Sequence, residues 1–149
     1  MLIHYFAFGS NMARARLLAR IPNAAPLGRG RLDGWRFACN KKGHDGSAKA
    51  NIHRDPSGAV WGVVYRMPRS QLPRLDAFEG GYERTRVHVV ELAHPSGRVH
   101  CETYFSERLL ESGSVFDWYK RHMVVGAREH ALPDPWVAML EALPDRPSR

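Results

Sequence analysis

The stretch Tyr5-Phe6-Ala7-Phe8-Gly9-Ser10-Asn11-Met12 decides how the chain begins to fold. Residues 3–8 are apolar at nearly every position, which predicts a strand buried in the centre of a sheet. The small residues Gly9, Ser10 and Asn11 end that strand and lead directly into a helix-like segment. A strand that enters a helix through such a turn leaves several backbone N–H groups free at one point, and these groups bind carboxylates and phosphates. The turn is therefore the first candidate for a ligand site.

Helices are predicted near both ends of the chain and once in its middle. Asn11 and Ser70 are placed to cap the first two helices through their side-chain oxygens. Pro22 predicts the end of the first helix, and Gly80-Gly81 predicts the end of the second. We expect helices from Met12 to near Ile21, over 71–78, over 114–125 and over 135–143.

Strand-like sequence fills the rest of the chain. Strands are expected over 25–39, 48–53, 60–67, 82–93 and 99–105. Residues 55–58 and 95–97 predict turns, the second of which closes a hairpin, and the polar segment 40–47 is expected to be a loop that serves as a lid or specificity loop. The pattern predicts an α+β fold, a small mixed domain with a curled, barrel-like β-sheet flanked by short helices.

Length and composition indicate one globular domain. The 149 residues are expected to form a single domain over 1–143 with a loose polar tail over 144–149. No apolar run reaches the length of a membrane span, and the N-terminal residues lack the layout of a signal peptide. Cys39 and Cys101 form no CxxC motif and are interpreted as reduced thiols. These features favour a cytoplasmic protein without a membrane partner.

The formal net charge of +7 raises the question of a nucleic-acid partner. The arginines are spread along the chain, and aromatic residues do not alternate with them as they do in a base-stacking surface. We therefore predict no nucleic-acid binding, and interpret the charge as a solvated basic surface that suits small anions.

Glu79 is the second informative residue. It follows an apolar helix and precedes two glycines, so its carboxyl group is expected to be partly desolvated, with open space beside it for a substrate. Desolvation raises a carboxyl pKa, which suits a general acid/base. The alternative is an exposed glutamate that only ends the helix, and the residues alone slightly favour it, because glutamate is common on surfaces.

Other chemistries are set aside on spacing. Ser10 lacks the second glycine of a nucleophile elbow, because that position is Met12. The glycines at 28, 30 and 34 miss the dinucleotide-binding spacing by one residue. His88, His94 and His100 could cluster on the hairpin with Cys101, but no metal-binding motif supports a site, and scattered surface histidines are the favoured interpretation. No metal is predicted.

Several motifs together resemble the γ-glutamylcyclotransferase family, also called the AIG2-like family. Residues 5–12 resemble its YFAYGSN(L/M) signature and depart from it only in Phe8, which stands for Tyr. Further segments resemble the family in the same order and spacing: Arg31-Leu32-Asp33-Gly34-Trp35, Val60-Trp61-Gly62-Val63-Val64-Tyr65, Leu75-Asp76-Ala77-Phe78-Glu79-Gly80, Tyr119-Lys120 and residues 123–132.

The resemblance implies an enzyme that releases 5-oxoproline from a small γ-glutamyl substrate, without a metal or cofactor. It implies that Gly9, Ser10 and Asn11 hold the substrate's α-carboxylate through backbone N–H groups and that Glu79 is the catalytic acid/base. Tyr5, Tyr82 and Tyr119 are expected to line the substrate pocket. A non-enzymatic module that binds a carboxylate on the same fold stays open as an alternative.

The substrate also stays open among γ-glutamyl amino acids, γ-glutamylamines and a γ-glutamylated biosynthetic intermediate. Lys41, Lys42 and His44 of the predicted loop could meet a second carboxylate. No oligomeric state is predicted.

Overall fold

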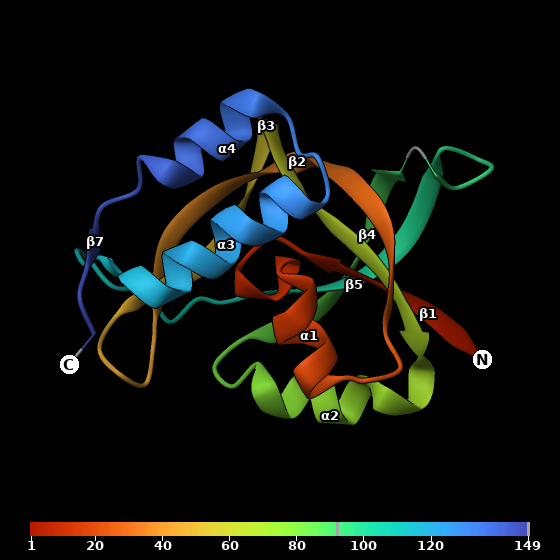
Figure 1. Cartoon of the computed structure of the whole chain (residues 1–149), viewed down its shortest axis with the longest axis horizontal. Helices are drawn as coiled ribbons and strands as arrows, with labels where there is room; N and C mark the ends of the chain where they lie inside the picture. Colours follow the sequence, from red (N-terminus) through yellow and green to blue (C-terminus); the bar gives the residue numbers. More distant parts are fainter. Residues whose placement is uncertain (92, 149) are drawn as a thin grey trace.

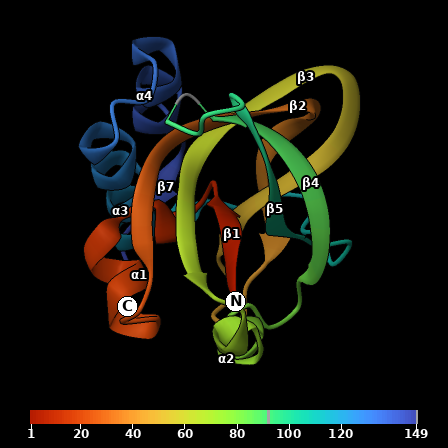
Figure 2. The ribbon, with the colours of Figure 1, turned by 90° about the vertical axis from the view of Figure 1, so that its right-hand side faces the viewer.

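A five-stranded closed barrel forms the body of the protein (Figures 1 and 2). The computed structural model describes residues 1–91 and 93–148. The strands follow one another around the barrel in the order β1-β3-β2-β4-β5, and β5 closes it by pairing in parallel with β1, whereas the other pairings are antiparallel. The five strands are β1 Leu2–Ala7, β2 Ala25–Lys42, β3 Ala48–Pro68, β4 Glu83–Glu91 and β5 Arg98–Phe105. The predicted α+β class with a barrel-like sheet is confirmed.

The described residues form four short α-helices, which lie along one side of the barrel and at one of its ends. They are α1 Arg14–Arg20, α2 Leu72–Phe78, α3 Asp117–Glu129 and α4 Asp134–Glu141, with 3-10 turns at Ser10–Met12 and Arg69–Gln71. Figure 2 shows α1, α3 and α4 along one side of the barrel and α2 below its lower end. None of the helices in the described part of the chain is long and apolar enough to cross a membrane.

The turn predicted at 55–58 is a bulge inside one long strand. The Ser57 N–H and hydroxyl both donate to Asp55 Oδ1, at 3.0 and 2.9 Å, so the expected local turn forms. Pairing with β2 resumes on both sides of it, and residues 55–58 bulge outward opposite Gly34. The prediction of two separate strands was therefore wrong, because the barrel absorbs the turn without ending the ladder.

Both predicted helix caps are wrong. Helix α1 begins after Ala13 and α2 begins after Gln71, and neither position supplies a side-chain cap. Asn11 and Ser70 lie in the 3-10 turns that precede these helices. The side chain of Asn11 bonds to distant residues instead.

Two element boundaries differ from those that the sequence predicted. Strand β2 runs through Lys42, so the predicted loop 40–47 shrinks to residues 43–47. Helix α3 starts at Asp117, because Val115–Phe116 (β6) pair in parallel with Asp145–Arg146 (β7). The tail expected to be loose thus contains a short strand, and its last residue, 149, lies outside the described residues.

Helix α3 presses directly on the turn that follows β1. A Cβ atom added at Gly126 would lie 2.3 Å from the Met12 carbonyl carbon and 2.4 Å from the Ala13 nitrogen. From the barrel side, the Tyr65 hydroxyl donates to the Met12 carbonyl at 3.0 Å. The turn is therefore held between α3 and the barrel wall.

We predict that Gly126→Ala destabilises the protein by about 1–3 kcal/mol, because the added methyl group has backbone on one side and cannot be accommodated without moving α3. Urea unfolding measures the loss. Val125→Ala is the matched control, because Val125 is 43% exposed on the same helix, and it should change the free energy of unfolding by less than about 0.5 kcal/mol. Equal stability of the two variants would contradict this packing.

Candidate active site

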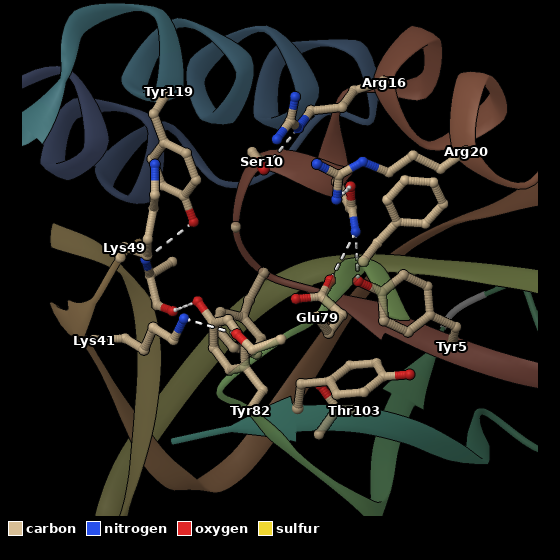
Figure 3. Close-up of a pocket in the computed structure, with 18 of the residues that line it drawn as sticks. Tyr5, Ser10, Arg16, Arg20, Lys41, Lys49, Glu79, Tyr82, Thr103 and Tyr119 are labelled. Carbon is tan, nitrogen blue, oxygen red and sulfur yellow. Dashed lines mark hydrogen bonds between the residues drawn. The ribbon is translucent and has the colours of Figure 1, made fainter. Parts of the chain in front are cut away.

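A cavity of about 220 Å³ opens between the turn after β1, the end of α2 and the barrel wall (Figure 3). All seven residues that the sequence singled out line it: Tyr5, Gly9, Ser10, Asn11, Glu79, Tyr82 and Tyr119. The fold thus brings together residues that come from β1 and the turn after it, from the segment that follows α2, and from α3.

Asn11 connects the acid to the turn. Its Nδ2 donates to Glu79 Oε1 at 2.9 Å and to the Tyr5 hydroxyl at 3.1 Å. Its Oδ1 accepts from Arg20 Nη1 at 3.3 Å. Asn11 and Tyr5 are buried, so this network fixes the orientation of the carboxyl group in a region largely shielded from water.

Glu79 lies half-buried in the cavity rather than on the outer surface. Its N–H donates to the Leu75 and Asp76 carbonyls at the end of α2, which holds the backbone in place. Burial raises the pKa of the Glu79 carboxyl, and the positive charges of Arg20, Lys41 and Arg16 oppose that rise. A raised pKa moves a carboxyl group toward the range in which a general acid/base works best.

The turn itself is tightly packed. A Cβ atom at Gly9 would lie 3.0 Å from Ala50 Cβ and 3.1 Å from the Tyr119 hydroxyl, so only glycine fits without displacing them. The Ser10 hydroxyl accepts from Arg16 Nε at 2.9 Å. Among the described residues, no acceptor is found for the backbone N–H groups of Ser10 and Asn11.

In the opposite wall of the cavity, two tyrosine hydroxyls bond to the backbone of the same residue. The Tyr82 hydroxyl donates to the Ala50 carbonyl at 2.6 Å, and the Ala50 N–H donates to the Tyr119 hydroxyl at 3.0 Å. Burial raises the pKa of both hydroxyls, so they stay protonated at neutral pH. Their hydrogen bonds make them supports for the cavity wall.

The comparisons with known proteins identify the family of the chain. A model of the AIG2-like family matches residues 59–140. A mouse protein named gamma-glutamylcyclotransferase is 33% identical over 150 aligned positions, which span 93% of this chain and 77% of the mouse protein. The chain belongs to the γ-glutamylcyclotransferase (AIG2-like) family. A human relative of the same name is also 33% identical, over 148 positions with the same coverage. A solved structure named gamma-glutamyl cyclotransferase superposes with a TM-score of 0.89 at 28% identity, over 98% of this chain and 90% of that one.

In this γ-glutamylcyclotransferase family member, four cations line the cavity, and sequence reasoning identified only one of them. Arg16 and Arg20 come from α1, Lys41 from β2 and Lys49 from β3. The spacing of Arg16 and Arg20, four residues apart directly after the turn, was the signal available for them, because it places both on one helix face. Of the three loop residues predicted to meet a carboxylate, Lys41 and His44 line the cavity, whereas Lys42 is exposed.

The space beside Gly81, the second glycine after Glu79, is not open. A Cβ atom at Gly81 would lie 2.9 Å from Lys41 Nζ, so the missing side chain makes room for this ammonium group. The backbone φ of +85° at Gly81 also favours glycine. The expectation that both glycines leave space for a substrate is therefore corrected for Gly81.

The histidines gather more than expected. The rings of His88 and His100 lie 4.1 Å apart, and His4 and His94 join them around a second surface concavity. The interpretation of these residues as scattered surface histidines was therefore wrong. No group of three or more His, Cys, Asp or Glu side chains in residues 1–91 and 93–148 is arranged to hold a metal ion.

The raised pKa of Glu79 predicts a pH-dependent effect on stability. The folded state binds this proton more tightly than the unfolded state, so the stabilisation is complete below the unfolded pKa and is lost as the pH rises through the folded pKa. Glu79→Gln cannot titrate, so its free energy of unfolding should rise relative to the wild type between pH 4 and pH 8. Urea unfolding across this range measures the difference. The exposed Glu111→Gln is the control and should follow the wild type at every pH. A constant difference for Glu79→Gln would contradict the burial of this charge.

Proposed function

We propose that the protein cyclises γ-glutamyl amides. The α-amine of the substrate attacks its own γ-carbonyl carbon, a new C–N bond closes the five-membered lactam, and the original amide C–N bond breaks. The products are 5-oxoproline and a free amine or amino acid. The observation that carries the proposal is the half-buried Glu79 carboxyl, bonded to Asn11 of the turn inside one cavity. The family membership supports the same reaction.

The turn is proposed to hold the α-carboxylate of the substrate. The N–H groups of Ser10 and Asn11, for which the described residues offer no acceptor, and the nearby charges of Arg16 and Arg20 favour an anion there. An anchored carboxylate restricts the substrate to conformations in which its amine can reach the γ-carbonyl. Such orientation supplies on the order of 7–11 kcal/mol in favourable intramolecular reactions.

Glu79 is proposed to move the protons. The attacking nitrogen loses two protons on its way from the α-ammonium to the lactam N–H, one of them before it attacks, and the departing amide nitrogen gains two as it leaves as an ammonium group. A single carboxylate within reach of both nitrogens can accept each proton in turn and deliver it to the leaving group. The raised pKa of Glu79 brings its proton affinity closer to that of the groups it serves.

Glu79→Gln should lower kcat for 5-oxoproline release by about 10²–10⁴-fold with little change in KM, because the amide keeps the shape and the hydrogen bond to Asn11 but cannot accept a proton. Chromatographic detection of 5-oxoproline with a panel of γ-glutamyl amino acids and amines measures the rates. Glu111→Gln is the control and should keep the wild-type rate.

Two outcomes would each overturn one part of the proposal, the reaction or the role of Glu79. If no compound of the panel yields 5-oxoproline, the enzymatic claim fails and the alternative, a carboxylate-binding module, gains support. If Glu79→Gln turns over at the wild-type rate, the reaction stands but the proton transfer belongs to another group.

A further inference from the structure

Two lysines lie opposite each other on neighbouring strands in the wall of the cavity. Lys41 on β2 pairs in register with Lys49 on β3, and both side chains line the cavity. Like charges directly opposite each other in a ladder destabilise a sheet. Lys41 is only 3% exposed and the Lys49 side chain 15%, so burial adds to that cost. A costly pair of this kind at a cavity indicates a role in binding rather than in stability.

Each of the two ammonium groups has bonding partners, but each also has N–H donors that take no part in a hydrogen bond among the described residues. Lys41 Nζ donates to the Gly80 carbonyl at 2.9 Å and lies 4.6 Å from the centre of the Tyr82 ring. Lys49 Nζ pairs with Asp45 at 3.2 Å and lies 4.6 Å from the Tyr119 ring. An ammonium group has three N–H donors, and among the described residues each lysine uses one of them in a hydrogen bond.

The charges around the cavity are unbalanced and divided between two sides. The side chains that line it carry four cations and a single carboxylate, Glu79. Figure 3 shows Arg16 and Arg20 beside Ser10 on one side, and Lys41 and Lys49 on the other, with Glu79 between the two pairs. The arginine side meets the anchored α-carboxylate of the proposed substrate. On the lysine side Asp45 offsets one of the two positive charges, which leaves a net positive charge there with no substrate group assigned to it.

We propose that Lys49, supported by Lys41, is the specificity-determining residue that recognises an anionic group on the leaving amine. This inference rests on the proposed function, because it concerns the amine that the proposed reaction releases from the substrate. A γ-glutamyl amino acid spans the cavity with a carboxylate at each end and the reacting amide beside Glu79. A γ-glutamyl alkylamine leaves the lysine pair without an anion. Lys41, which also holds the Gly80 carbonyl next to Glu79, acts in addition as a positioning residue.

A matched pair of substrates tests the inference. γ-Glutamyl-alanine and γ-glutamyl-ethylamide differ only by the carboxylate on the leaving amine. We expect the wild type to prefer γ-glutamyl-alanine by about tenfold or more in kcat/KM, the factor expected for one hydrogen bond to a charged group. Lys49→Met should lower kcat/KM for γ-glutamyl-alanine by a similar factor and change that for γ-glutamyl-ethylamide by less than about twofold. Lys42→Met is the control, because Lys42 is the exposed neighbour of the pair, and it should change neither value.

The outcomes separate this inference from the proposed function. Equal rates of the wild type on both substrates, or an equal loss on both in Lys49→Met, would overturn the specificity role. If neither substrate yields 5-oxoproline, the proposed function fails, and calorimetric binding of the two compounds to the wild type and to Lys49→Met still decides whether the lysine pair recognises the second carboxylate. Circular dichroism melting of each variant confirms that it is folded.

Discussion

The side-chain amide of Asn11 is the interaction on which the site depends. An amide offers donors and an acceptor in fixed directions, and this one joins Glu79 after α2, Tyr5 in β1 and Arg20 in α1. Residues of β1 and α1 are thereby held in one geometry with Glu79, which lies 68 positions further along the chain than Asn11. The acid is oriented before any substrate arrives, which is the condition for catalysis by positioning rather than by a reactive nucleophile.

The barrel and α3 make that geometry rigid. The turn that carries Asn11 is clamped between Gly126 of α3 and the Tyr65 hydroxyl of the barrel. Across the cavity, two tyrosine hydroxyls fix the N–H and carbonyl of Ala50. The remaining wall carries the buried Lys41 beside the partly buried Lys49. The protein thus combines a tightly packed frame with a charged cavity, which suits the anionic ligand proposed for it.

Local patterns in the sequence were sufficient for the central strand and the turn after it. For Glu79 they slightly favoured an exposed residue, and only the resemblance to the family pointed to a place in the site. They failed where a distant partner competes with a local one. Asn11 has the composition of a helix cap, but Glu79 lies 68 residues further on and offers a charged acceptor. Lys41 reads as part of a polar loop until its pairing with Lys49 extends the strand. Gly81 predicts a space that only the fold shows to be filled by Lys41.

The most direct test of the account is a crystal structure with 5-oxoproline, the product of the proposed reaction, bound in the cavity. The account predicts the product carboxylate at the N–H groups of Ser10 and Asn11 and the lactam nitrogen within hydrogen-bond reach, about 2.6–3.2 Å, of the Glu79 carboxyl. A product whose carboxylate lies on Lys41 and Lys49, with its ring out of reach of Glu79, would contradict it.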